Sequence, residues 1–241
     1  AQIRSEGFET TNVPNGSFAA VIGNVPFGDF ALRDPSYNPK RLSIHNHFIV
    51  KSLDLTAPGG YVVALTSRYT MDKLDPKARA YLADRANFIG AIRLPNNLFT
   101  EHAGTEVGSD LVILQKKAAT GELSERQRDF IESRKLSNGI RINNLFQSFD
   151  RVTHTEAKVG KDPYGKPAME FTHAEGVDGI DREMRRMLSE DFNRHFNESY
   201  CLEHAPEQTP GTPERELSRS RQAERQRAER YEPRLAGEIV K

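Results

Sequence analysis

The chain has 241 residues, which suffices for one medium domain with appendages or for two small domains. Hydrophobic residues make up 37% and charged residues 28%, so part of the chain is expected to lie outside a packed core. Lysine plus arginine equals aspartate plus glutamate at 34 each, which excludes a uniformly basic surface and leaves only a local one for nucleic acid.

The sequence shows no sign of export or membrane insertion. The single cysteine, Cys201, excludes an intramolecular disulfide and fits a reducing cytoplasm. No apolar run is long enough to span a bilayer, so no membrane partner is expected, and the first residues lack signal-peptide character. Because the chain starts without methionine, in what resembles a strand, we expect a fragment or a processed product.

The first half of the chain alternates between strand and helix patterns. The expected elements, in chain order, are a short strand at 2–8, a strand at 18–24, a helix at 41–57, a strand at 61–67, a helix at 75–86, and strands at 88–95 and 109–117. The apolar run at 18–24 is typical of a parallel strand covered on both faces. Strands that alternate with helices predict a parallel sheet with crossover helices, and hence an α/β fold over residues 1–118.

Individual residues set the expected ends of the two helices. Pro58, Gly59 and Gly60 are expected to stop the first helix. Asp75 is expected to cap the start of the second helix, with Pro76 at the first helical position, where its missing N–H has no intrahelical partner to lose.

The composition changes after residue 118. We expect a charged helix at 121–136, a hairpin at 152–173 with its turn at 162–165, and an amphipathic helix at 181–200. The apolar stripe of that last helix, expected to dock on the core or on a neighbouring domain, consists of Met184, Met187, Leu188, Phe192 and Phe196. Prolines then mark a linker, and balanced charges predict a solvated helical or disordered tail. We therefore divide the chain into 1–118, an extension at 119–200, and a linker and tail at 201–241.

The predicted strand at 18–24 ends on Asn24 and is followed by Val25, Pro26 and the aromatic Phe27. Ligands of open parallel sheets bind outside the carboxyl ends of the strands, which is where this turn lies. A proline turn with a packed aromatic is the ordinary interpretation of so short a pattern. The residues Ser67, Arg68 and Tyr69 follow the next strand and could line the same cleft, as could residues 93–96, although polarity at a strand end explains both groups almost as well.

The turn resembles the Asn-Pro-Pro-Tyr/Phe motif of S-adenosylmethionine-dependent methyltransferases that act on exocyclic amino groups. Residues 53–73 look like the helix, Pro-Gly-Gly turn and strand of that fold, and residues 91–117 resemble the Leu-Pro…Phe…Gly-Thr…Val-Leu-Lys segment of adenine-specific DNA methyltransferases, including type I modification subunits. The resemblance covers the first half of the chain and is closest to helicase-fused methylases of phages and plasmids. It implies the back half of a Rossmann-like class I methyltransferase sheet, S-adenosylmethionine as cofactor, DNA as partner, a restriction–modification context, and a fused or associated helicase.

The resemblance also assigns roles to the turn. The side-chain carbonyl of Asn24 and the backbone carbonyl of Val25 would accept the two hydrogens of an adenine amino group, which favours a pyramidal nitrogen whose lone pair is free. Phe27 would stack on a base that has left the duplex. Val25 departs from the usual proline, but its backbone carbonyl does not depend on the side chain, and Pro26 keeps Val25 extended.

The family's glycine-rich cofactor loop is not found in this sequence. Phe8 and Glu9 resemble a strand end that flanks the cofactor adenine, and a simple turn explains them equally well. We therefore expect the first strands of the sheet to precede Ala1, in a missing N-terminal part of the same protein. The 241 residues alone are expected to be inactive.

Histidines provide two further candidates. His45 and His47 are separated by one residue and lie on different sides of a helix, so we expect one packed and one exposed histidine and no metal site. His102 lies in a loop on the cofactor side of the predicted sheet, where solvent exposure is the expected state and a substrate contact the alternative.

Two alternatives to an adenine DNA methyltransferase stay open. The same fold and motif serve enzymes that act on cytosine, RNA or protein glutamine, and the segment 93–107 favours DNA among these substrates. In the second alternative the chain is a non-catalytic DNA-binding or antirestriction scaffold, and Val25 marks chemistry that has been lost.

Overall fold

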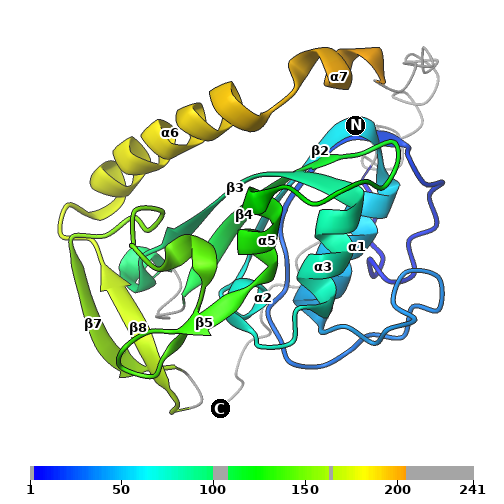
Figure 1. Ribbon diagram of the computed structural model, residues 1–241. Coiled ribbons are helices and arrows are strands. Elements are labelled where there is room, and N and C mark those ends of the chain that lie inside the picture. Colours follow the sequence, from blue (N-terminus) through cyan, green and yellow to red (C-terminus); the bar gives the residue numbers. More distant parts are fainter. Residues whose placement is uncertain (1–2, 100–107, 163–164, 205–241) are drawn as a thin grey trace, which may run out of the picture. The chain divides into compact units, whose positions relative to one another are not determined.

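The computed structural model describes residues 3–99, 108–162 and 165–204 (Figure 1). Its centre is a four-stranded sheet of β1 (Phe18–Asn24), β2 (Thr56–Ser67), β4 (Ser109–Lys116) and β3 (Ala86–Leu94), in that order. β1 pairs with β2 in parallel, and β4 is antiparallel to both of its neighbours. The predicted α/β fold with a partial sheet is confirmed, whereas the prediction that every strand is parallel is wrong for β4.

β4 departs from the predicted parallel topology, because it runs antiparallel to both β2 and β3. A parallel pair needs a crossover of a dozen or more residues, usually a helix laid across one face of the sheet. The described part of the segment between β3 and β4 contains only the short 3-10 helix η1 (Asn96–Phe99). β4 lies antiparallel between β2 and β3.

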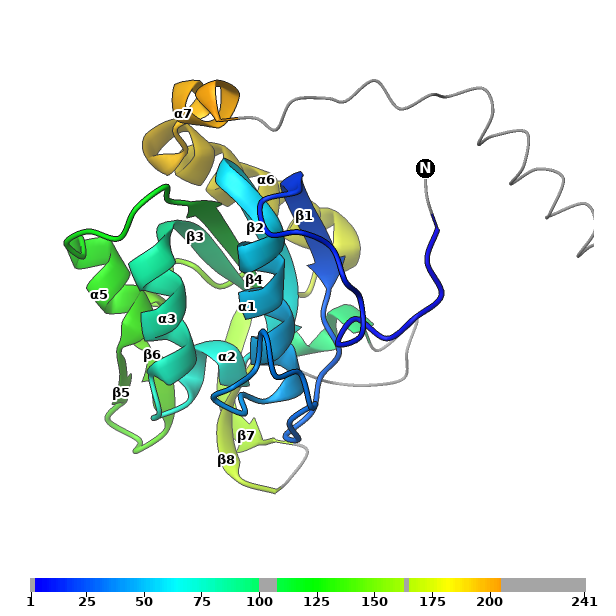
Figure 2. The ribbon, with the colours of Figure 1, turned by 90° about the vertical axis from the view of Figure 1, so that its right-hand side faces the viewer.

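Two helices cover one face of the sheet and form the main core with it (Figure 2). They are α1 (Ile44–Leu55) and α3 (Lys77–Arg85), with the short α2 (Tyr69–Asp72) between β2 and α3. The fully buried members of this core include Ile49, Leu53, Met71, Leu82 and Leu114. This arrangement confirms both predicted helices, since their apolar residues follow the helical period that such packing requires.

Three predicted boundaries are corrected. α1 ends at Leu55, and β2 starts at Thr56 and takes in residues 58–60, which therefore extend a strand. Pro76 is the N-cap of α3, while the Asp75 carboxylate accepts from the Lys77 amide at 3.1 Å. Residues 3–7 form no strand, because the segment turns at Gly7, whose carbonyl accepts from two threonine amides.

β1 lies at the edge of the sheet (Figure 2) and is not covered on both faces as its apolar sequence predicted. Val21 packs against the main core, but Ile22 on the opposite face is 70% exposed, and Phe18 is also exposed. Within the described residues only β2 pairs with β1, so the other edge carries unpaired backbone groups. β1 therefore has the apolar composition of a buried strand, although it lies at an open edge of the sheet.

The extension after β4 consists of helices and two hairpins. Its elements are α5 (Glu125–Ile131), β5 (Ser133–Lys135), β6 (Arg141–Asn143), η2 (Asn144–Phe146), β7 (Glu156–Lys161), β8 (Pro167–Thr172), α6 (Gly176–His195) and α7 (Glu198–Glu203). The hairpin β7–β8 and the amphipathic helix α6 are confirmed. The predicted helix at 121–136 is shorter: a capping box of Ser124 and Gln127 starts it, and it ends at Ile131 because the next residues pair as β5 with β6.

α6 covers the opposite face of the sheet, along β3. Met187 is buried against Ile92 and Leu94, which confirms that the methionine stripe docks on the core. A polar contact fixes the same helix: Asp191 is buried and forms ion pairs with Arg126 at 2.9 Å and with Arg151. Apolar contacts therefore pack α6 against the sheet, and ion pairs join it to the rest of the extension.

The described residues up to 204 belong to one compact unit. Residues 205–241 and residues 100–107, which include His102, lie outside the described residues. None of the described helices is long and apolar enough to cross a membrane.

Candidate functional site

A cleft of about 320 Å³ opens at the carboxyl ends of β1 and β2. It is lined by Phe27, Gly28, Asp29, His45, Ser67, Arg68, Tyr69, Lys73, Gly108 and Lys166. The structure thus brings Phe27 together with all three residues predicted to follow β2. This position outside the strand ends is where open α/β sheets bind their ligands.

The turn after β1 places its four residues differently. Asn24 ends the strand and is exposed, while the Val25 side chain is buried in the main core and its amide donates to the Leu65 carbonyl at 3.0 Å. Pro26 has no N–H to continue this pairing, which ends the strand. Phe27 is 39% exposed and forms a wall of the cleft, whereas Asn24, Val25 and Pro26 are not among its lining residues.

The oxygens that the resemblance selects are available. Among the described residues, no hydrogen bond uses the Asn24 side chain or the Val25 carbonyl. A buried carbonyl usually has a partner within the protein, so acceptors left open beside a cleft can receive hydrogens from a bound molecule. The turn therefore carries two acceptors with no partner among the described residues, in the two residues before Pro26 and Phe27.

The second wall of the cleft is fixed by a residue from the extension. Asp162 follows β7 and accepts from the Tyr69 hydroxyl at 2.5 Å, and one Arg68 guanidinium nitrogen lies 3.6 Å from the same carboxylate. The Arg68 guanidinium also lies over the Tyr69 ring at 5.1 Å. Burial and the bond to Asp162 raise the pKa of Tyr69 above 10.0, so its hydroxyl stays protonated at neutral pH.

His45 lines the cleft and is only 3% exposed. Its Nε2 lies 2.9 Å from the Ser43 hydroxyl, and its buried Nδ1 has no hydrogen-bond partner among the described residues. Burial, followed by the charge of Lys73, lowers the pKa of His45 to about 4, although Gly28 and Asp29 act in the opposite direction. The His45 ring is therefore neutral near pH 7.

His47 is also buried, so the prediction that one of the two histidines is exposed is wrong. α1 packs against the sheet on one side and against the segment at 28–34 on the other, which encloses both rings. His47 Nε2 lies 3.0 Å from an Asp34 carboxylate oxygen. No group of three metal-ligating side chains occurs in the described part of the chain.

Phe8 and Glu9 contact a buried lysine. The Lys51 ammonium donates to the Glu9 carbonyl at 3.2 Å and to Asp34 at 3.0 Å, and it lies over the Phe8 ring at 5.2 Å. Burial opposes ionisation of Asp34, but the bonds from Lys51, from the Tyr37 amide and from His47 outweigh it and lower the pKa of Asp34. The cluster fixes the turn at 7–11 against α1.

These contacts bear on the fit of S-adenosylmethionine. The Phe8 ring packs at 4.8 Å from Phe48, and the Glu9 carboxylate folds back over Gly7. β1 is the first described strand, and no glycine-rich loop follows an earlier one. Because their side chains are engaged in these contacts, Phe8 and Glu9 do not form a complete site for this cofactor.

Residues 93–96 do not line the cleft. Arg93 is buried and forms a bidentate ion pair with Asp110, at 2.8 and 2.9 Å, and a further ion pair with Asp72 at 2.9 Å. Burial alone would lower the pKa of Arg93, but the two carboxylates raise it. The Asn96 side chain accepts from the Phe171 amide at 3.0 Å, so this strand end anchors β8.

The sequence did not single out several residues of the site, among them His45, Lys73, Asp162 and Lys166. The sequence predicted only that His45 is either packed or exposed, and it predicted no role in a ligand site for Lys73, Asp162 or Lys166. The Asp-Pro-Tyr-Gly turn indicated a hairpin, but it carried no signal that the hairpin reaches a strand end more than ninety residues earlier.

Comparisons with known proteins find partial similarities. No protein-family model matches the chain. The chain is 32% identical over 121 residues to Defense against restriction protein B of Escherichia phage P1, a match that covers 48% of this chain and 5% of that protein. This chain thus spans a small part of the length of that relative.

Three solved structures overlap the chain partially. A putative class I S-adenosylmethionine-dependent methyltransferase of Listeria monocytogenes is 22% identical, with a TM-score of 0.39 over 48% of this chain and 36% of that chain. The M protein of the type I restriction enzyme EcoKI is 14% identical, with a TM-score of 0.38 over 78% and 50%. A modification subunit of a putative type I restriction enzyme from Vibrio vulnificus is 12% identical, with a TM-score of 0.36 over 69% and 39%.

Proposed function

We propose that the chain is the carboxyl-terminal part of a methyltransferase domain that methylates the exocyclic amino group of adenine in DNA. The observation that carries the proposal is the turn at residues 24–27, where two acceptors without a partner among the described residues precede Phe27, which forms a wall of the cleft at the end of β1. The similarity to a phage protein named for defence against restriction supports a role in restriction and modification.

The residues of this chain would orient the base. An adenine amino group is a weak nucleophile because its lone pair is delocalised into the ring. Acceptance of both amino hydrogens by Asn24 and Val25 favours a pyramidal nitrogen and exposes its lone pair, at a point where positive charge develops during transfer. Phe27 supplies a stacking face for the extruded base. The proposal needs no strong general base, because the amine becomes acidic as the new bond forms.

We propose that a preceding segment of the same protein supplies the cofactor site and the missing strands. The open edge of β1 and the exposed Ile22 and Phe18 support this, since an unpaired strand with an apolar face is a template for further pairing. The chain together with that segment is called the complete protein below. The segment would bind S-adenosylmethionine, and a helicase would be fused or associated.

The experiment is a methylation assay on adenine-containing DNA with the complete protein. Asn24→Ala should lower the rate about a hundredfold or more, since one preorganised acceptor of this kind contributes about 3 kcal/mol or more. The matched control is Asn87→Ala, which removes an exposed asparagine from β3 and should leave the rate unchanged. A near-normal rate in Asn24→Ala would overturn the proposal.

A further inference from the structure

The β7–β8 turn meets the cleft through a buried carboxylate. The Asp162 side chain is 2% exposed and contacts Tyr69 and Arg68, which lie at the end of β2. Its other oxygen accepts from the Lys166 amide at 2.7 Å, and the Asp162 amide donates to the Lys166 carbonyl at 2.8 Å. One carboxylate therefore holds the end of β2 and the backbone of Lys166 in a fixed relation.

Lys166 is placed at the cleft by this arrangement. Its side chain is exposed and lines the cleft together with Phe27. Within the described residues it has no ion pair, whereas Lys73 in the cleft pairs with Asp29 at 3.5 Å, and Lys158 on the same hairpin pairs with Glu170 at 3.7 Å. The positive charge of Arg68 lies next to the negative charge of Asp162. Lys166 has no such partner among the described residues, so its charge is available to a ligand.

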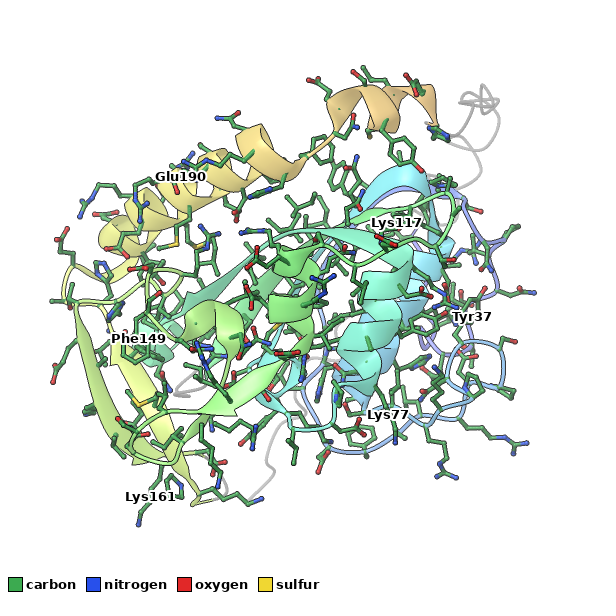
Figure 3. The ribbon with its side chains drawn as sticks, viewed as in Figure 1. Tyr37, Lys77, Lys117, Phe149, Lys161 and Glu190 are labelled. Carbon is green, nitrogen blue, oxygen red and sulfur yellow. The ribbon has the colours of Figure 1, made fainter. Side chains whose placement is uncertain are left out.

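A cation and a stacking face at one cleft suit a single strand of nucleic acid. Proteins that hold such strands combine aromatic faces for the bases with cations for the backbone. The chain as a whole has no net charge, so its contribution to such binding depends on the position of individual cations. Lys161, at the end of β7, belongs to the same hairpin as Lys166 (Figure 3), but unlike Lys166 it does not line the cleft.

We propose that Lys166 binds a backbone phosphate of single-stranded DNA next to the base in the cleft, and that Asp162 is the positioning residue that aims it. The inference rests on the proposed function in that it takes DNA as the substrate. It extends that function by assigning to the extension a direct contact with the substrate strand. The hairpin thereby becomes part of the binding site as well as a structural element.

The test measures binding of a fluorescent, adenine-containing single strand to the complete protein by anisotropy at several salt concentrations. Loss of one phosphate contact lowers the slope of log affinity against log salt by about 0.7 for single strands. Lys166→Ala should show this change, and Lys166→Arg should not. The matched control is Lys158→Ala, which removes a lysine from the same hairpin outside the cleft and should keep the wild-type slope. An unchanged slope in Lys166→Ala would overturn the inference.

The positioning role of Asp162 requires a second comparison. If Asp162 aims Lys166, Lys166→Ala should change the slope in the wild-type background and have no further effect in an Asp162→Ala background. Equal effects in both backgrounds would show that Asp162 does not position Lys166. Should Asp162→Ala fail to fold, the comparison of Lys166→Ala with Lys158→Ala still decides the phosphate contact.

The readout separates this inference from the proposed function, because binding of a single strand requires no methyl transfer. Normal methylation by Asn24→Ala would overturn the proposed function and leave a positive result for Lys166 intact. Binding of RNA but not of DNA of the same sequence by the wild-type protein would overturn the assignment to DNA.

Discussion

Replacement of His45 by glutamine tests the electrostatic account of the cleft. In the folded chain burial, aided by Lys73, lowers the pKa of His45 from the ordinary 6.5 to about 4. The unfolded chain takes up this proton near the ordinary value, so between pH 6.5 and 4 it binds more protons than the folded chain. Stability must then fall as the pH falls through this window, and it is fully present above it.

The size of the effect follows from the two pKa values. A shift of this size lowers the free energy of unfolding by about 2 kcal/mol between pH 7 and pH 5. Glutamine does not titrate, so His45→Gln should lose about 2 kcal/mol less than the wild-type chain over the same interval. The variant can be less stable than the wild type at pH 7, because the prediction concerns only the change with pH.

Hydrogen exchange of the α1 amides in the complete protein is measured at pH 7, 6 and 5 and at increasing urea concentrations. It gives the free energy of opening the unit that contains His45 at each pH. The control is Ser43→Ala, which removes the hydroxyl next to Nε2, leaves the buried imidazole in place, and should keep the wild-type pH dependence. An identical pH dependence in His45→Gln and the wild type would refute a neutral buried histidine at this wall.

Three further predictions concern the core and the turn. Arg93→Leu should lower the free energy of unfolding by about 3–5 kcal/mol in urea denaturation, because it leaves the Asp110 and Asp72 carboxylates buried without their cation, whereas Arg185→Leu on the exposed side of α6 should cause no measurable loss. Equal stabilities of these two variants would contradict the assignment of Arg93 to the core. Phe27→Ala should weaken binding of an adenine-containing single strand, measured by anisotropy, whereas Phe27→Tyr should not. Equal affinities of these two variants would exclude a stacking role for Phe27. Val25→Pro keeps the Val25 carbonyl but removes the amide that donates to Leu65, so the rate of methylation should fall; an unchanged rate would show that this bond is not needed.

The sequence predicted the strand end and the two covering helices because these depend on local patterns. Pro26 ends β1 through its missing N–H, and the apolar residues of α1 and α3 recur at the helical period. Strand direction has no such local signature, because the apolar run of β4 fits a parallel or an antiparallel neighbour equally well.

The remaining errors have a common physical origin in contacts between distant segments. His45 and His47 are both buried because α1 is enclosed between the sheet and the segment at 28–34, which helical period alone does not indicate. Asp162 reaches Tyr69 across 93 residues, and no periodicity in either segment predicts that contact. The exposure of β1 likewise depends on which strands lie beside it.

The most direct measurement identifies the product. The complete protein is incubated with S-adenosylmethionine and DNA, and the DNA is then digested to nucleosides for mass spectrometry. The account predicts adenine methylated on its exocyclic amino group, in an amount that falls about a hundredfold or more in Asn24→Ala. Methylated cytosine alone, methylation of RNA or protein instead of DNA, or adenine methylation that is unaffected by Asn24→Ala would contradict it.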